Sequence, residues 1–274
     1  CDAIVHLAGL AHQQASTASR LPEFLRINAE GTRLLARSAS RARVRRFVFV
    51  SSIAAVRTRS DTPVDDSTPC APTDAYGCSK LEAERALLGE LKNAPTDWCI
   101  LRPPLVYGPG NPGNMRRLLQ LMSSGLPLPL ASIRNRRSFI FVDNLVDALV
   151  RVLRHPPKVC STYVLSDGSD FSTPELVTAL AAAAGRRVRL FPVPVSVLGM
   201  LGRAGDAAGA LLDKTVGLST AVDRLVGSLP VDGTRFRQSF EWHPRINPDA
   251  ALRQTARAPL GPAHTRPDSA QKST

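Results

Sequence analysis

Tyr76 and Lys80 are the two residues whose types and spacing could do acid–base chemistry. They stand four positions apart in the string YGCSK. In a helix this spacing puts both side chains on one face, so the phenol and the ammonium can converge on one point. A nearby ammonium favours the phenolate and lowers the pKa of a tyrosine below its ordinary value of about 10. The spacing therefore indicates a general acid and base for a hydroxyl or carbonyl group, with a solvated surface pair as the alternative.

The elements around this string would bring a serine to the same place. The β-rich run 47–50 predicts a strand that ends at Ser51 and Ser52, and residues 76–91 predict the helix that carries the tyrosine and the lysine. In open α/β sheets, ligands bind at the carboxyl ends of the strands. We therefore expect Ser52 to hydrogen-bond the same reacting oxygen as the tyrosine.

Apolar runs that are typical of buried strands alternate with helical patterns along the chain. This alternation predicts a parallel sheet that is covered by helices on both faces. The expected strands are 3–8, 47–50, 98–101, 139–142, 163–165 and 188–190. The expected helices are 21–42, 76–91, 114–124, 143–155 with Asp143 as its N-cap, and 173–184 capped by Ser172 or Thr173.

The composition excludes several classes of protein. No run of 18 apolar residues lacks a charge or a turn former, so we expect no transmembrane segment. The five cysteines form no CxxC pair, which is typical of reduced thiols in a cytoplasm rather than of a disulfide framework or a metal site. The net charge is +12, but aromatic residues make up only 5% and the basic residues are spread along the chain. We therefore expect no nucleic-acid partner, while a polyanionic small substrate stays compatible.

Six strings, in order, resemble the extended short-chain dehydrogenase/reductases, specifically the NAD-dependent epimerase/dehydratase family that acts on nucleotide sugars. They are DAIVHLAG, NAEGT, FVFVSS, YGCSK, LRPPLVYGPG and RSFIFVDNLVDAL, and the resemblance runs from Asp2 to about residue 257. Within the family the chain is similar to UDP-N-acetylhexosamine 4-epimerases and 4-keto-reductases that serve bacterial surface polysaccharides.

The resemblance implies an α/β fold, a Rossmann-like doubly wound parallel sheet with a smaller C-terminal α/β lobe. Residues 1–108 would form the catalytic part of the dinucleotide-binding Rossmann domain. Residues 109–258 would form mainly the nucleotide-sugar lobe, with 139–167 returning to the sheet. Residues 259–274 lack periodicity and predict a disordered tail.

The resemblance also implies a role for each matching residue. Tyr76 would be the acid and base, Lys80 would hold the nicotinamide ribose and lower the tyrosine pKa, and Ser52 would orient the sugar oxygen at C4. The cofactor, NAD or NADP, would lie against Ala8, Gly9, Asn28, Ser51, Tyr76, Lys80, Pro103, Leu105 and Val106. The substrate would lie against His12, Ser52, Asn114, Arg137 and Arg224.

Three of these substrate residues would meet the diphosphate. Asn114 would do so through an amide at a helix start, and Arg137 and Arg224 through guanidinium forks. His12 falls near the sugar pocket, with an ordinary surface or core histidine as the alternative. No metal is implied.

One family feature is not found before Asp2. The family opens with a strand and a GxxGxxG turn for the cofactor pyrophosphate, so we expect a Rossmann domain truncated at its N-terminus, from a truncated gene product, a partial gene model or an excised fragment. Residues 199–205 do spell GxxGxxG. Pro192 and Pro194 spoil a central strand before them, so we expect a small-residue helix or turn there, with contact to a membrane surface as a minor alternative.

The expected function is NAD(P)-dependent epimerisation or reduction at C4 of a UDP-sugar in the cytoplasm. Ile53-Ala54-Ala55 stands where a dehydratase usually adds an acidic pair, which disfavours dehydration. A truncated non-catalytic remnant that binds nucleotide sugar or a partner without turnover is the alternative. A DNA-binding module is the weakest hypothesis, and a homodimer is left open.

Overall fold

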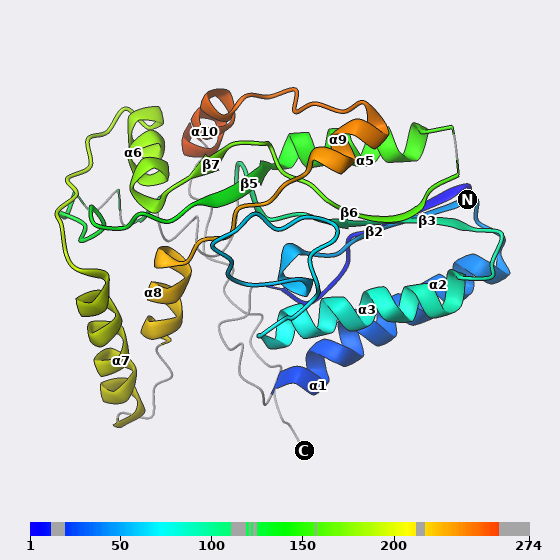
Figure 1. The fold of residues 1–274 in the computed structure, drawn as a ribbon, viewed down its shortest axis with the longest axis horizontal. Helices are drawn as coiled ribbons and strands as arrows, with labels where there is room; N and C mark the ends of the chain where they lie inside the picture. The colour runs from blue at the N-terminus through cyan, green and yellow to red at the C-terminus, as the bar shows by residue number, and fades with distance from the viewer. Residues whose placement is uncertain are drawn as a thin grey trace, which may run out of the picture.

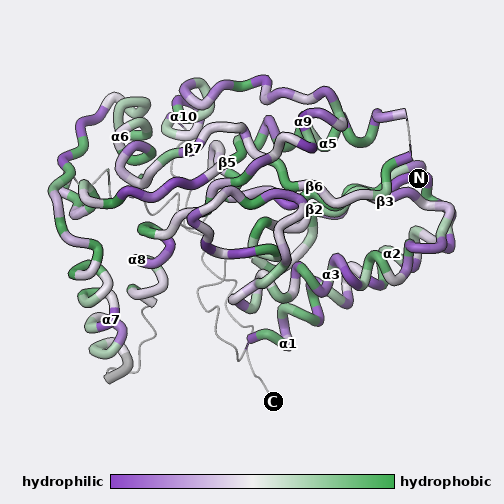
Figure 2. The backbone as a smooth tube through the Cα atoms, in the orientation of Figure 1, coloured by the Kyte–Doolittle hydropathy of each residue, from purple (hydrophilic) through white to green (hydrophobic). Residues whose placement is uncertain are grey.

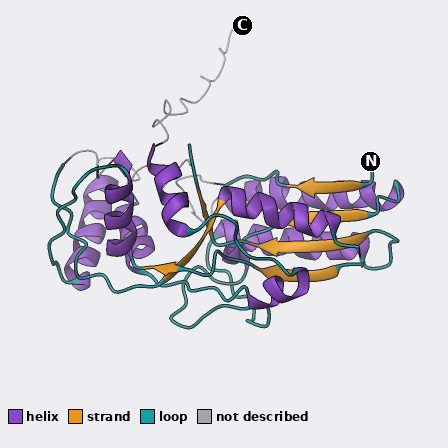
Figure 3. Ribbon diagram, turned by 90° about the horizontal axis from the view of Figure 1, so that it is seen from above, coloured by secondary structure: helices purple, strands orange, loops and turns teal. Residues whose placement is uncertain are grey.

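A four-stranded parallel sheet is the centre of the computed structural model, which describes residues 1–11, 20–110, 119–120, 122, 125–156, 158–211 and 217–257. Its strand order is β1 (Ala3–His6), β2 (Arg46–Val50), β3 (Asp97–Arg102) and β6 (Cys160–Val164). Figure 3 shows these strands side by side and running the same way. The predicted α/β class with a parallel sheet is confirmed.

Side chains of the central strands alternate between two apolar layers. Phe47 and Phe49 pack against α2 (Gly31–Arg41) and α3 (Ala75–Leu91), while Val48 packs against α5 (Val142–Arg154) and α9 (Thr234–Phe240). Successive residues of a strand point to opposite faces, so a continuous apolar run needs cover on both. Figure 1 shows these helix pairs on opposite sides of the sheet, which is the doubly wound arrangement.

A second, three-stranded sheet joins the main sheet to the remaining helices. Its order is β4 (Leu105–Tyr107), β5 (Arg137–Phe141) and β7 (Asp170–Phe171). Phe139 and Phe141 of β5 pack with α6 (Thr173–Ala183) and α10 (Pro248–Arg257). Of the segment 139–167, which was expected to return to the main sheet, β6 pairs with β3, whereas β5 pairs with β4 and β7.

Several predicted elements differ in detail. The helix expected over 21–42 is divided into α1 (Leu21–Phe24), a π-helical turn η2 (Leu25–Glu30) and α2. A π-helical turn contains more residues than an α-helical one, and the spacing of apolar residues in the sequence does not distinguish the two. Asp143 is not the N-cap of α5, since the helix starts at Val142 and places Asp143 in its first turn. Ser172 caps α6 in a capping box with Glu175, as one of the two alternatives predicted.

The predicted GxxGxxG segment is a helix, which confirms that it is no phosphate turn. It lies within α7 (Val195–Leu211), which packs against α8 (Leu218–Val226). A Cβ on Gly202 would lie 3.0 Å from the Cα of Ser219, and one on Gly205 would lie 2.5 Å from Leu218. The glycines therefore permit close packing of two helices.

A buried ion pair joins the two central strands at their amino ends. Arg46 and Asp97 face each other in the β2–β3 register, with Nη2 2.8 Å from Oδ2, and Arg46 is 1% exposed. Arg46 also donates to the carbonyls of Val152 and His155, and Asp97 also accepts from the amide of Val159. The pair thus holds β2, β3 and the end of α5 together.

All five cysteines are free thiols in the structure, in line with the absence of a predicted disulfide framework. The predicted tail 259–274 lies outside the described residues, as do most of the helix expected at 114–124 and the two site residues His12 and Asn114.

Candidate active site

Ser52 and Tyr76 meet at the carboxyl end of β2. Ser52 is the N-cap of the short helix η3 (Ile53–Ala55), where its hydroxyl accepts a hydrogen bond from the Ala54 amide at 3.2 Å. Asp74 caps α3 by accepting from the Gly77 amide at 2.7 Å, which places Tyr76 in the first turn. The Ser52 hydroxyl lies near enough to the Tyr76 phenol to lower its pKa. The structure thus brings together two of the three predicted catalytic groups.

A glycine lets the two short elements approach. A Cβ on Gly77 would lie 2.3 Å from the carbonyl oxygen of Ala54, far inside any real contact. The start of α3 can therefore touch η3 only because position 77 carries no side chain. This contact sets the distance between Ser52 on one element and Tyr76 on the other.

The pKa of Tyr76 is raised above its ordinary value, which reverses the predicted direction. Burial is the largest cause, the charge of Asp74 adds to it, and the nearby Ser52 hydroxyl opposes it. Burial disfavours the phenolate, and the expectation of a lowered value took account only of the neighbouring ammonium. In this structure the phenol is accordingly protonated near neutral pH.

Lys80 is buried beside this pair, one turn further along α3. Its ammonium donates to the Val50 carbonyl at 3.0 Å and lies 4.8 Å from the ring centre of Phe49. Burial lowers the pKa of Lys80 to about 8, and the carboxylate of Glu84 opposes that shift. The predicted lysine is therefore held at the carboxyl edge of β2, within the same site.

The loop after β1 is fastened against Lys80 by Asn28. The Asn28 side chain accepts from the Leu10 amide at 2.6 Å, donates to the Leu10 carbonyl at 3.1 Å and donates to the hydroxyl of Ser79 at 2.9 Å. It is buried within η2, and π-helical turns occur often at functional sites. Asn28, which was predicted to bind cofactor, thus positions the loop that contains Gly9.

A buried polar network that the sequence analysis missed lies beneath the site. Ser51 donates to Glu84, and Arg102 donates to the same carboxylate at 2.6 and 3.0 Å. Glu84 is 3% exposed, and its only sequence signal is an acid four positions after Lys80. The hydroxyl of Ser51, a predicted cofactor contact, is therefore turned to the packing of β2, β3 and α3.

The other predicted cofactor residues lie on neighbouring strand ends. Ala8 and Gly9 follow β1 and are exposed. Pro103 is buried after β3 and accepts from the Ile53 amide at 2.9 Å, which ties η3 to this edge. Leu105 and Val106 lie on β4 and are at least partly exposed.

The geometry at Gly9 fits a dinucleotide that lies across the strand ends. A Cβ on Gly9 would be 3.1 Å from Asn28 Oδ1 and 3.4 Å from Lys80 Nζ, so only a bare backbone leaves that corner open. An ammonium has three donors, so Lys80 can hold the Val50 carbonyl and ribose hydroxyls together. Gly9, Lys80 and the exposed Ala8 are the residues that would hold the nicotinamide end.

Arg137 and Arg224 lie next to each other where β5 begins. Arg137 begins β5 and donates to the backbone carbonyls of Arg224 at 2.7 Å and Gly227 at 3.1 Å. Burial lowers the pKa of Arg137, and the like charge of Arg224 lowers it further. The structure thus brings together the two predicted diphosphate residues, and an anion bound there would relieve their repulsion.

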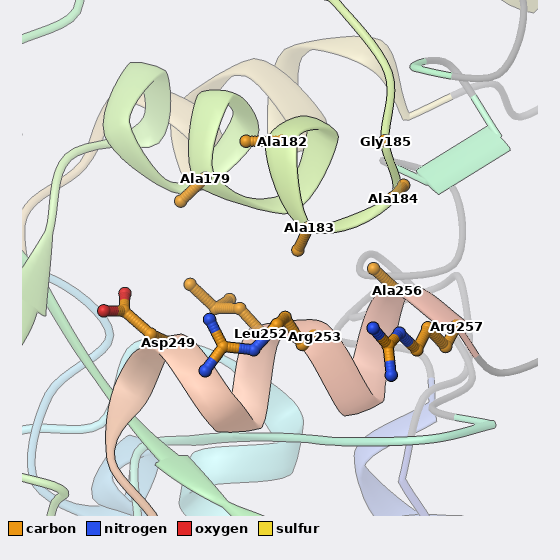
Figure 4. Close-up of a pocket in the computed structure, with 10 residues that line it drawn as sticks. All are labelled: Ala179, Ala182, Ala183, Ala184, Gly185, Asp249, Leu252, Arg253, Ala256 and Arg257. Carbon is orange, nitrogen blue, oxygen red and sulfur yellow. The ribbon is translucent and has the colours of Figure 1, made fainter.

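A separate cavity of about 670 Å³ lies between α6 and α10 (Figure 4). Four alanines of α6 and its end face Leu252 and Arg253 across it. None of the predicted site residues lines it. Within the part of the chain that the structure describes, no group of three or more His, Cys, Asp or Glu side chains could hold a metal ion.

Comparison with known proteins assigns this chain, with its doubly wound sheet, to one family. The profile of the NAD dependent epimerase/dehydratase family matches residues 1–165. The chain is 36% identical over 259 residues to the UDP-glucose 4-epimerase of Vibrio cholerae, a match that covers 93% of this chain and 76% of the relative. This protein belongs to the NAD-dependent epimerase/dehydratase family.

Two further similarities agree with this assignment. The N-acetyl-alpha-D-glucosaminyl-diphospho-ditrans,octacis-undecaprenol 4-epimerase of Escherichia coli O157:H7 is 26% identical over 87% of this chain and 72% of its own. The fold matches that of the UDP-glucose 4-epimerase from Brucella ovis in complex with NAD, with a TM-score of 0.72 and 19% identity over 93% of this chain and 77% of the other.

The family assignment also gives the cofactor and the class of reaction. The family is NAD-dependent, and solved proteins of the same fold hold NAD or NADPH. The relatives that match this chain include 4-epimerases and dehydratases of sugars, and also a ceramide reductase of Caulobacter vibrioides. No helix in the described part of the chain is both long and apolar enough to span a membrane.

Proposed function

We propose that this protein epimerises or reduces C4 of a UDP-sugar, with a UDP-N-acetylhexosamine or its 4-keto form as the substrate. The observation that carries the proposal is the Ser52 hydroxyl next to the buried Tyr76 phenol at the carboxyl end of β2, with the Lys80 ammonium bonded to the Val50 carbonyl of that strand. In this proposal the protein works in the cytoplasm, in the synthesis of surface polysaccharide.

The hydroxyl groups of Tyr76 and Ser52 act on the sugar oxygen at C4, Tyr76 by transferring the proton and Ser52 by holding the oxygen. The chemistry that NAD(P) supplies when bound is hydride acceptance from C4 and hydride return to it. Tyr76 takes the proton of the C4 hydroxyl during oxidation and gives one to the 4-keto oxygen during reduction. Ser52 holds that oxygen through its own hydrogen bond. A phenol whose pKa is raised by burial keeps its proton near neutral pH, which is the form that reduction requires.

Lys80 and the arginine pair position the two ends of the reacting complex. Lys80 would hold the ribose hydroxyls, and its positive charge would favour the phenolate that oxidation requires. Arg137 and Arg224 would hold the substrate diphosphate, because two adjacent guanidinium groups suit two negative charges. His12 and Asn114 are proposed to complete the sugar and diphosphate contacts.

Incubating the purified protein with UDP-N-acetylglucosamine and NAD tests the proposal. An epimerase yields the C4 epimer without net cofactor change, whereas a 4-keto-reductase oxidises NADPH or NADH only when the 4-keto sugar is supplied. Anion-exchange chromatography and the absorbance of the reduced cofactor separate these results. Binding of the UDP-sugar without either reaction would instead support the non-catalytic remnant.

A further inference from the structure

Helix α7 exposes a stripe of large apolar side chains. Val197, Met200, Leu201 and Ala204 follow the i, i+3, i+4, i+7 spacing of one helix face, and all four are exposed. Met200 is 67% and Leu201 is 62% exposed, the values expected of charged surface residues rather than of apolar ones. Figure 2 colours much of this helix green, and Figure 1 places it at the edge of the molecule.

The packing of α7 against α8 explains why this stripe faces outward. Leu198, Gly202 and Gly205 lie on the adjoining face, which packs toward α8, and the two glycines contact the start of α8. Asp206 fixes the pair of helices by accepting from the amides of Leu218 at 2.6 Å and Ser219 at 3.0 Å. The helix therefore buries Leu198 and its two glycines against its neighbours and leaves Val197, Met200 and Leu201 exposed.

The charge from Arg186 to the end of α7 is mainly positive, and the one acid there, Asp206, accepts hydrogen bonds from the start of α8. Residues 176–205 contain the arginines at 186, 187, 189 and 203 and no aspartate or glutamate. All four arginines are exposed, and Phe191, which precedes α7, is 42% exposed. An apolar helix face flanked by arginines is the pattern of helices that lie in the interface of an anionic bilayer.

We propose that α7 docks this protein on the surface of anionic phospholipid bilayers. The apolar stripe would enter the boundary between headgroups and acyl chains, and the arginines would contact lipid phosphates. The inference goes beyond the proposed function and does not rest on it. It has a consequence for that function, because Arg224 lies on α8 beside α7, so a sugar diphosphate carried by a membrane lipid could also reach the arginine pair.

Vesicle flotation of the purified protein tests the proposal. We expect the protein to float with vesicles that contain phosphatidylglycerol and to stay unbound with phosphatidylcholine alone. Binding should weaken as salt is raised, because screening shortens the reach of the arginine charges. The double variant Met200→Gln/Leu201→Gln should bind at least about tenfold more weakly, since it removes two apolar side chains from the interface.

Val146→Gln is the matched control, because Val146 is 52% exposed on α5, outside the α7 stripe. It should float like the unchanged protein, and circular dichroism should show that every variant is folded. Three results would each overturn the proposal. They are no flotation with anionic vesicles, equal flotation of the α7 double variant, and a self-association of the protein that the double variant abolishes.

Discussion

Tyr76 shows how far a spacing can be taken as evidence of chemistry. The four-residue interval put the tyrosine and Lys80 one turn apart on the same helix, because a regular helix fixes the angle between them, and their joint catalytic role stays a prediction. The direction of the tyrosine pKa was wrong, because burial acts through neighbours that are distant in sequence. The buried partners Glu84 and Arg102 escaped prediction for the same reason.

Replacing Tyr76 by Phe should lower turnover of the C4 reaction by about 10²-fold or more, which is the usual contribution of a general acid and base. The fold should persist, since the ring and its contact with Phe24 remain. Tyr163→Phe removes a hydroxyl from a buried tyrosine of β6 and is the control. Steady-state kinetics measure both, and wild-type turnover of the Tyr76 variant would assign the proton transfer to another group.

Replacing Arg137 by Ala should raise KM for the UDP-sugar by about tenfold or more, because a hydrogen bond to a charged group contributes about 1.5–3 kcal/mol. Arg136→Ala is the control at the adjacent position, where the side chain is 73% exposed and pairs with Asp170. An unchanged KM for the Arg137 variant would leave the diphosphate to other residues, and Arg224→Ala would then be measured.

At the scale of elements, the predicted strands at 47–50 and 98–101 are confirmed because apolar β-rich runs are their own signal. The three-residue strand β4 and the two-residue strand β7 were not predicted. Both are too short to show a period, and their partners on β5 are distant in sequence. The site depends on one such unpredicted contact, between η3 and the start of α3.

Replacing Gly77 by Ala should lower kcat by at least about tenfold, because the new methyl group must push η3 away from α3 and small displacements in a site are costly. Gly89→Ala makes the same change on the same helix, where a Cβ meets nothing within 4 Å. That control should keep its activity and gain up to about 1 kcal/mol in stability. Equal activity of the two variants would show that the η3–α3 contact does not set the Ser52–Tyr76 geometry.

At the scale of the whole molecule, the free energy of unfolding depends on pH through several buried titratable groups. His6 donates or accepts at Thr32 Oγ1 at 2.9 Å and stacks on Phe49. Burial, with a smaller effect of the Lys80 charge, lowers the pKa of His6 to about 4. Asp167 acts in the opposite direction, because burial raises its pKa to about 6. The folded state therefore resists protonation at His6 and accepts it at Asp167.

The free energy of unfolding should fall by about 2 kcal/mol through His6 as the pH drops from about 7 to about 5. The sign follows because the unfolded imidazole, with its ordinary pKa of 6.5, binds a proton before the folded one does. The contribution is complete above that value and is lost toward pH 4. Urea unfolding at several pH values measures it, and His6→Gln should remove this part of the slope. An identical slope in that variant would assign the effect elsewhere.

The ion pair of Arg46 and Asp97 couples the substitutions that are tolerated at one position to those tolerated at the other. Loss of either side chain alone strands a buried charge at a cost of about 3–5 kcal/mol, a large share of a typical domain's stability. Joint replacement by apolar residues is often nearly neutral. Unfolding measurements on Arg46→Met, Asp97→Leu and the double variant should therefore find a double variant more stable than either single one, and simple additivity would contradict this. Replacing the two residues one at a time in evolution would pass through a destabilised single variant. Related sequences should therefore keep both residues or have neither.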